Sequence, residues 1–137
     1  MLRKLLGSLA IAAAVAVSYI HDGVAAETAY APQVSDARGI KVTVILQHIK
    51  KEAKTWDFEV TLETHTKALN EDLSESSVLL VDGKQYMFLG WEGTPPGGHH
   101  RKGLLRFKAI EQQPRSLELQ LRLAGETSPR SFKWLLK

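Results

Sequence analysis

The sequence predicts an all-β fold: an immunoglobulin-like, two-sheet sandwich of about seven antiparallel strands, preceded by a signal peptide. Three observations lead to this prediction. Apolar and polar residues alternate with a period of two in several segments, which is typical of strands with one buried and one solvated face. The segments recur at roughly the 8–12-residue spacing of sandwiches and barrels. Long amphipathic helices, which would separate the strands of a parallel sheet, are not evident between them.

The first 26 residues have the features of a cleavable signal peptide. Arg3 and Lys4 form a positive start, residues 5–20 are uncharged and mostly apolar, and residues 24–26 are small. The apolar run is shorter than the ~20 residues that a membrane span needs. We therefore expect export to the periplasm or the extracellular space, with no membrane span in the mature chain.

The remaining chain is long enough for one domain. We expect residues 27–38 to be a flexible lead-in and residues 39–137 to form the sandwich. The sequence contains no cysteine, so the domain must be held by its core rather than by disulfides. Removal of residues 1–26 leaves 16 basic and 14 acidic side chains, a formal net charge of +2. This balance argues against nucleic acid as a partner.

Five segments show the strand alternation clearly, beginning near residues 40, 56, 104, 117 and 132. In each of them every second residue is apolar, which predicts the side chains that face the core. These residues are Ile40, Val42, Val44 and Leu46; Trp56, Phe58, Val60 and Leu62; Leu105, Phe107 and Ala109; Leu117, Leu119, Leu121 and Leu123; and Phe132, Trp134 and Leu136.

Two shorter features complete the predicted fold. Asp82-Gly83 lies between two apolar runs, which predicts a tight hairpin that pairs residues 78–81 with residues 84–90. Leu69 and Leu73 are four residues apart in a polar stretch, so we expect a helical turn at one end of the sandwich. Arg115 and Arg130 precede strands and are expected to be solvated turn residues.

The segment "GWEGTPPGGHHRKG", residues 90–103, is the least ordinary part of the chain. Its prolines and glycines are turn residues, so it has a purely structural interpretation as a rigid connector between strands. Its cations suggest a second interpretation, an anion or ligand site that gains charge below about pH 6.5. The candidate ligand-binding residues are Trp91, His99, His100 and Arg101, with Lys102 beside them.

A metal site is the third interpretation of these histidines. His65 follows a predicted strand and lies near His99 and His100 if the two loops share one end of the sandwich. Three imidazoles would suit copper or zinc. The difficulty is that neighbouring residues in extended backbone point to opposite sides, so His99 and His100 need a turn between them to share one ion.

Patterns typical of enzymes are not present in the sequence. It has no cysteine nucleophile, no G-x-S-x-G elbow and no H-E-x-x-H. We therefore predict a secreted, non-enzymatic binding or interaction module, with histidine-based copper or zinc binding as the alternative. The partner would be another envelope or secreted protein. One way to bind it is through an edge strand of the sandwich, which can pair with a strand of the partner.

The chain resembles a group of small secreted bacterial and archaeal β-sandwich domains to which no activity is assigned. The shared features are a strand ending in Thr-His, a W-x-G…GGHHR-x-G-x-L-x-F segment and an aromatic C-terminal strand. The resemblance covers most of residues 40–137, and it implies the fold and secretion. It also implies importance for Thr64, His65, Trp91, Gly97, Gly98, His99, His100, Arg101 and Gly103.

The similarity to periplasmic copper-carrier domains is only general. Those domains are also small sandwiches with histidine ligands, but they tend to have a histidine at the mature N-terminus and methionine-rich segments. Here the mature chain would begin near Glu27, and Met87 is the only methionine after Met1.

Overall fold

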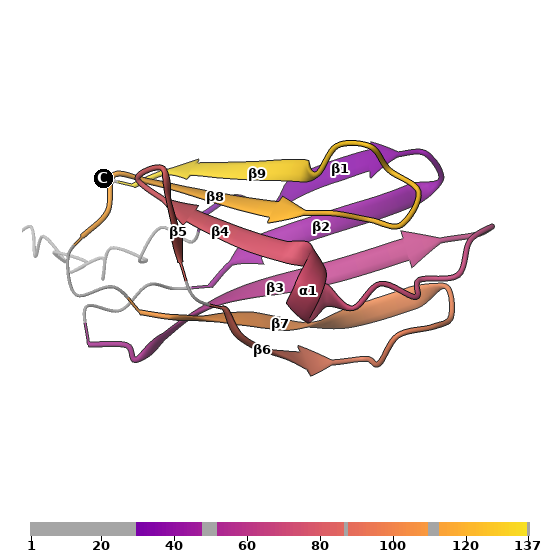
Figure 1. Ribbon diagram of the computed structural model, residues 1–137, viewed down its shortest axis with the longest axis horizontal. Coiled ribbons are helices and arrows are strands. Elements are labelled where there is room, and N and C mark those ends of the chain that lie inside the picture. Colours follow the sequence, from indigo (N-terminus) through magenta and orange to yellow (C-terminus); the bar gives the residue numbers. More distant parts are fainter. Residues whose placement is uncertain (1–29, 48–51, 87, 110–112, 137) are drawn as a thin grey trace, which may run out of the picture.

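The computed structural model describes residues 30–47, 52–86, 88–109 and 113–136. The predicted signal peptide lies outside the described residues. Within them, strands account for most of the chain and the one helix is short (Figure 1). The elements are β1 (Gln33–Ala37), β2 (Ile40–Leu46), β3 (Thr55–Thr64), α1 (Leu73–Ser76), β4 (Ser77–Val81), β5 (Lys84–Tyr86), β6 (Phe88–Gly93), β7 (His100–Lys108), β8 (Ser116–Leu121) and β9 (Arg130–Leu135).

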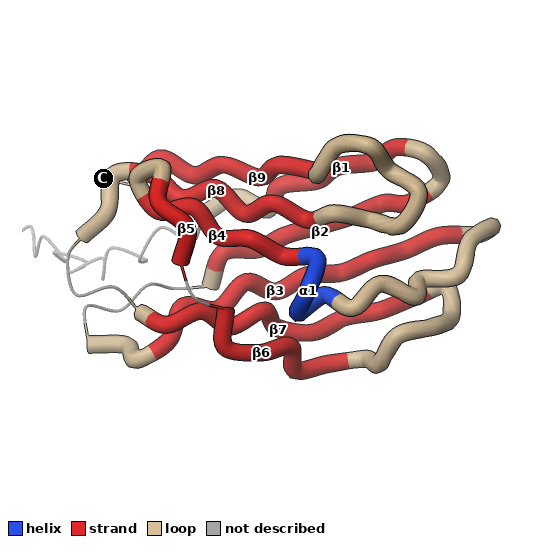
Figure 2. Tube along the Cα trace, viewed as in Figure 1, coloured by secondary structure: helices blue, strands red, loops and turns tan. Residues whose placement is uncertain are grey.

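The strands form two sheets that face each other, as Figure 2 shows by the two layers of strands. The first sheet has the order β1-β2-β3-β7-β6, and the second has the order β5-β4-β8-β9. Every strand pair in the described ranges is antiparallel. The predicted all-β, two-sheet antiparallel sandwich is confirmed. The hairpin at Asp82-Gly83 is confirmed too, with positive φ at both residues and β4 paired to β5.

The core between the sheets consists of the side chains that the alternation predicts. Nearly all of the predicted inward residues are buried, while Ala109 and Leu136 are partly buried. Phe58 lies at the centre and joins the two layers: its ring meets Phe107 edge to face at 5.7 Å and Trp134 at 5.3 Å between centroids. Trp56 is buried as well. Burial of these large apolar side chains is the main term that stabilises the sandwich.

Strand β1 is a departure from the expected flexible lead-in. Residues 33–37 pair with β2 over five positions, from Gln33 opposite Val44 to Ala37 opposite Ile40. The turn between the strands is short, with positive φ at Arg38 and Gly39. The segment "QVSDA" lacks an apolar alternation because it is an edge strand with little buried surface. Its strand structure comes from backbone pairing and from the contacts described below.

The segment after the hairpin is a second departure, because the expected single strand 84–90 divides between the two sheets. Strand β5 ends at Tyr86 in the second sheet, and β6 begins at Phe88 in the first. In Figure 1, β5 lies beside β4 and β6 lies beside β7. Because of this crossing and of β1, the described part has nine strands rather than about seven. The crossing closes one side of the sandwich.

The opposite side is closed by polar side chains between β1 and β9. The amide of Gln33 donates to the carbonyl of Lys133, and its oxygen accepts from the Lys133 backbone N–H at 3.0 Å. The side-chain amide of Gln33 therefore makes the two hydrogen bonds to Lys133 that the backbone of a neighbouring strand would make. It occupies backbone groups of β9 that an edge strand would otherwise leave open.

Arg130 completes this closure. Only 7% of the residue is exposed, contrary to the expected solvated turn residue. Its guanidinium donates to the carbonyl oxygens of Ser35 at 3.0 Å, Ala37 at 2.8 Å and Ile40 at 2.7 Å, and its Nε lies 2.9 Å from Glu126. We call this arrangement the Arg130 clasp. It ties the β1–β2 hairpin of the first sheet to β9 of the second.

Replacing Arg130 by methionine is expected to lower the free energy of unfolding by about 2 kcal/mol. The effect is limited because Ser35 and Ala37 lie on an edge strand, where water can replace the guanidinium as donor. Amide hydrogen exchange should show the loss as faster exchange throughout β1. The exposed Arg115→Met change is the control and should alter stability by less than about 0.5 kcal/mol. Unchanged protection of the β1 amides would contradict the role of the clasp.

Among the described residues, no helix is long and apolar enough to cross a membrane. The one helix they contain, α1, has four residues.

Candidate functional site

Residues 90–103 form a closely packed connection between β6 and β7. Gly93 and Gly103 are paired directly across these strands, and the Trp91 ring lies against the pair. A β-carbon on Gly103 would come within 2.7 Å of both Gly93 Cα and Trp91 Cζ2, and it would overlap the Glu92 carbonyl oxygen. Two backbones approach here more closely than any side chain allows. The W-x-G…G part of the pattern therefore has a steric reason.

Arg101 is the most deeply buried polar residue of the segment, with 0% of its surface exposed. Its Nη1 donates to Glu71 O at 2.7 Å and more weakly to Leu69 O at 3.4 Å. Its Nε and Nη2 both donate to Thr94 O at 3.3 Å, and its guanidinium carbon lies 5.6 Å from the centroid of the Trp91 ring. We call this arrangement the Arg101 clasp. This buried position differs from the anion- or ligand-binding role that the sequence suggested for Arg101.

Two opposing effects act on the Arg101 guanidinium. Burial lowers the pKa of Arg101, because the charged form loses its hydration, while the negative charges of Glu71 and Asp72 raise it. The clasp is therefore a buried cation that is compensated by nearby carboxylates and by carbonyl oxygens.

Backbone hydrogen bonds hold the 94–99 loop against the segment that follows β3. Gly97 N–H donates to Leu69 O at 2.7 Å, and Leu69 N–H donates to Gly98 O at 3.0 Å. Thr64 N–H donates to His99 O at 2.9 Å. Positive φ values of 115° at Gly97 and 71° at Gly98 give the loop its shape, as the turn interpretation requires. These contacts order the loop without any ligand.

The predicted metal site of His65, His99 and His100 is not formed. All three residues are exposed, and the described part of the chain contains no group of three or more histidine, cysteine or acidic side chains that could hold an ion. His100 lies opposite Glu63 on β3, with Nδ1 3.7 Å from a carboxylate oxygen. The three residues occupy different places: His65 lies in the bend after β3, His99 lies in the bend before β7, and His100 is the first residue of β7.

Two further cations of β7, Lys102 and Arg106, are also engaged, on the outer face of the first sheet. Lys102 lies 3.2 Å from Glu59, and Arg106 lies 3.5 Å from Asp57 and 2.9 Å from Glu92. The indole N–H of Trp91 donates within its own loop, to Thr94 O at 3.0 Å. The anion site predicted at Trp91, His99, His100 and Arg101 therefore gains no support from their arrangement.

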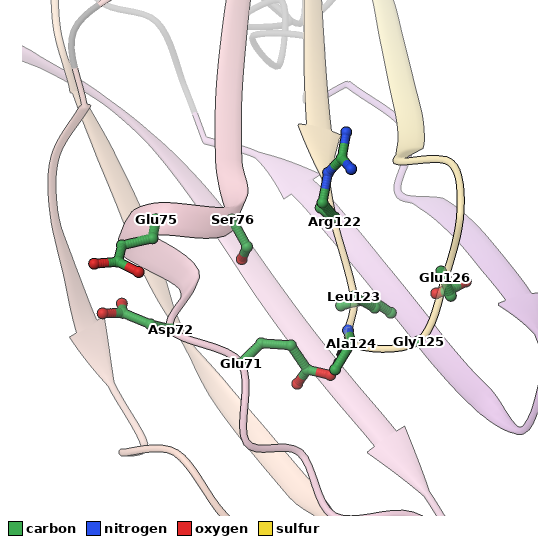
Figure 3. A pocket seen from close by; sticks show the side chains of 9 residues that line it. All are labelled: Glu71, Asp72, Glu75, Ser76, Arg122, Leu123, Ala124, Gly125 and Glu126. Atoms are coloured by element: carbon green, nitrogen blue, oxygen red, sulfur yellow. Dashed lines mark hydrogen bonds between the residues drawn. The ribbon is translucent and has the colours of Figure 1, made fainter.

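A different feature is a recess on the surface. An open recess of about 360 Å³ lies between α1 and the connection from β8 to β9 (Figure 3). We call it the acidic recess, because four of its nine lining residues are carboxylic acids. The lining residues are Glu71, Asp72, Glu75, Ser76, Arg122, Leu123, Ala124, Gly125 and Glu126.

Glu71 is the distinctive residue of the acidic recess. Only 8% of it is exposed. Figure 3 shows its side chain reaching across to Ala124, whose N–H donates to Oε1 at 3.1 Å. The second oxygen, Oε2, is buried and has no hydrogen-bond partner among the described residues; the same holds for the hydroxyl of Ser76. Buried polar atoms normally have a partner, so each of these two requires an explanation.

The recess has an excess of negative charge. Asp72 caps α1 by accepting from the backbone N–H and the hydroxyl of Ser74, and these bonds lower the pKa of Asp72. Both oxygens of Glu126 accept from Arg130 Nε, so that carboxylate is neutralised. The guanidinium of Arg122 points away from the other labelled side chains in Figure 3. Arg101 partly offsets the charges of Glu71 and Asp72, and the exposed carboxylate of Glu75 adds to the excess.

The acidic recess had no signal in the sequence that a local pattern could detect. "NEDLSESS" has the composition of a polar loop, and the contact that orders Glu71 joins it to Ala124, 53 residues later in the chain. The burial of Arg101, in contrast, could have been predicted. If β7 begins at residue 100, Arg101 lies on the same face of the strand as Leu105 and Phe107, which point into the core.

Comparison of the chain with models of known protein families and with curated proteins found no match. The class of the protein is therefore defined by its own structure: an all-β, two-sheet sandwich with an acidic recess beside its one described helix.

Proposed function

We propose that the protein is an exported, non-enzymatic binding module, and that it binds its ligand in the acidic recess. Export is supported by the positive start, apolar run and small residues of positions 1–26. Binding in the recess is supported above all by one observation, the four carboxylic acids among its nine lining residues. The volume of about 360 Å³ is within the range of small-ligand pockets, roughly 300–1,000 Å³.

The ligand that fits this site carries positive charge. Asp72 and Glu75 are exposed carboxylates of the lining, and a cation with N–H groups can form charge-assisted hydrogen bonds with them. The structural hydrogen bonds of Glu71 and Asp72 hold their carboxylates in place before the ligand arrives. Such preorganisation favours recognition, since little side-chain freedom remains to be lost on binding.

The test is a titration of the isotopically labelled protein with small probes of similar size and different charge. We expect n-butylammonium or n-butylguanidinium to give saturable amide shifts at Ala124 and near Ser76, because Ala124 N–H bonds the Glu71 carboxylate. Butyrate and butanol should give no saturable shift there. Equal responses to cation and anion, or no response to either cation, would exclude the recess as the binding site.

A further inference from the structure

We infer that a second copy of this chain pairs with the free edge of β6, so that the first sheets of two molecules join edge to edge around a two-fold axis. This dimer does not involve the acidic recess. Three features of the edge support it: open backbone groups, complementary charges, and a glycine that a single chain does not require.

The edge of β6 has backbone groups that point away from β7. Thr94 N–H donates to Lys102 O at 3.0 Å, so these two residues form a hydrogen-bonded pair of the ladder. Hydrogen-bonded pairs alternate with non-hydrogen-bonded pairs along antiparallel strands. The N–H and C=O groups of Gly93 and Trp91 therefore face outward, and no turn, loop or side-chain hydrogen bond of the described residues reaches them.

The other edges of the two sheets offer less. Side chains of Arg130 and Gln33 occupy backbone groups of β1 and β9, and β5 has only three residues. In β6 a bulge at Leu89 limits regular pairing to residues 90–93, of which Glu92 and Gly93 are exposed. Figure 1 shows β6 at the lower margin of the first sheet, with no other described strand or helix below it. An open edge of this kind is a template for a strand of another chain.

Gly90 has no steric reason within a single chain. A β-carbon at this position meets no atom within 4 Å, and φ of Gly90 is not positive. Glycine in the interior of a strand weakens it and often marks a place where another backbone approaches closely. Because Gly90 lies opposite Arg106, its empty side-chain position is on the outer face of the sheet.

A two-fold axis at Trp91 brings opposite charges together at this empty position. The outward backbone groups of Trp91 then pair with those of Trp91 of the second copy, and Gly90 faces Glu92 of the second copy. Arg106, Gly90 and Glu92 of the second copy lie in one row across the outer face. The Arg106 guanidinium donates to Glu92 of its own chain at 2.9 Å and has further N–H groups for the second carboxylate. The two-fold axis repeats this row, so the interface contains it twice.

The neighbouring register is less favourable. An axis at Glu92 would place the Glu92 side chains of the two copies directly opposite each other, and like charges in that position destabilise a strand pair. The charges of β6 and β7 therefore select the axis at Trp91. Since the paired stretch is short, the dimer belongs to the class of small, weak interfaces.

Sedimentation velocity of the purified protein, from micromolar to millimolar concentration, measures this association. We expect a dimer whose share rises with concentration. Gly90→Glu places a carboxylate opposite Glu92 at two symmetric positions, and it should weaken the dimer about tenfold or more. Gly90→Gln has the same size without the charge, and its dissociation constant should stay within about threefold of the parent value. A protein that stays monomeric over this range, or equal effects of the two variants, would overturn the inference.

Engineered cysteines test the register, because the chain has no cysteine of its own. In the proposed dimer the Cα atoms of residue 92 and of residue 90 of the second copy lie about 4.5 Å apart, which a disulfide can span. Under mild oxidation, a mixture of Gly90→Cys and Glu92→Cys should therefore form the mixed disulfide faster than either variant forms its own. Lys67→Cys, exposed after β3, measures the rate of random collision. Cross-linking at that background rate, or fastest for Glu92→Cys with itself, would refute the proposed pairing.

Discussion

Replacing Arg101 by methionine is expected to lower the free energy of unfolding by about 3–5 kcal/mol. Glu71 O loses the donor that lies 2.7 Å from it, and Leu69 O and Thr94 O each lose part of their hydrogen bonding. These groups surround a residue with no exposed surface, so water does not replace the guanidinium without a rearrangement. The stacking of the guanidinium on the Trp91 ring is lost as well.

Urea denaturation followed by tryptophan fluorescence measures this loss. Arg106→Met is the matched control on the same strand: Arg106 is one-third exposed and pairs with Asp57 and Glu92 on the outer face. Surface ion pairs contribute at most about 1 kcal/mol, so this control should stay close to the parent. Arg101→Lys should be intermediate, since one ammonium does not reach both Glu71 O and Thr94 O as the planar guanidinium does. Equal effects of Arg101→Met and Arg106→Met would show that the clasp does not hold the two loops.

The second large loss of stability is expected for Gly103→Ala, which should lower the free energy of unfolding by about 3 kcal/mol. The added methyl group would lie 2.7 Å from Gly93 Cα and from the Trp91 ring, and would overlap the Glu92 carbonyl. The first and last of these obstacles are backbone atoms of β6, which do not rotate away as a side chain does. The strands β6 and β7 must therefore separate locally, and such overpacking typically costs about 1–3 kcal/mol before hydrogen bonds are lost.

Gly90→Ala provides the control for this change. Gly90 lies on β6, three residues from Gly93, and a β-carbon there meets no atom within 4 Å. We expect a change in stability of less than about 0.5 kcal/mol, or a small gain from the reduced freedom of the unfolded chain. Thermal unfolding of both variants checks the prediction. If Gly103→Ala were as stable as Gly90→Ala, the close backbone contact would not be the reason for glycine at this position.

Much of the fold followed from the periodicity of the sequence. The alternation in β2, β3 and β8 identified buried side chains correctly, because a sandwich strand presents every second residue to the core. The hairpin at Asp82-Gly83 was equally predictable, since its turn requires positive φ. These features depend only on residues that are close together in the chain.

The features that were missed depend on distant residues. Strand β1 is held by β2, by the contact of Gln33 with Lys133 and by the Arg130 clasp, and all of these partners lie outside its five residues. Arg101 and Arg130 share the parity of the buried residues after them, but an arginine on an inward face was interpreted as a surface residue. The expectation was wrong because the clasps supply carbonyl acceptors from other strands and loops.

The candidate site, too, was only partly predictable from the sequence. The glycine-rich segment was conspicuous in the sequence, yet its Trp91, Gly93, Arg101 and Gly103 explain one another by packing. The acidic recess had an ordinary composition and became visible only through the contact of Glu71 with Ala124. A conspicuous motif indicates that residues are constrained, but it does not tell whether the constraint is a ligand or the chain itself.

The two arginine clasps have a consequence for the conditions under which the domain keeps its shape. Small exported domains are commonly closed by disulfides, whose formation requires an oxidant and whose integrity depends on the surrounding reduction potential. This chain has no thiol, and its two long-range closures join guanidinium groups to carbonyl oxygens, which no reductant cleaves. Its folding is therefore independent of any oxidising machinery, and the same native closures can form in a reducing compartment as in an oxidising one.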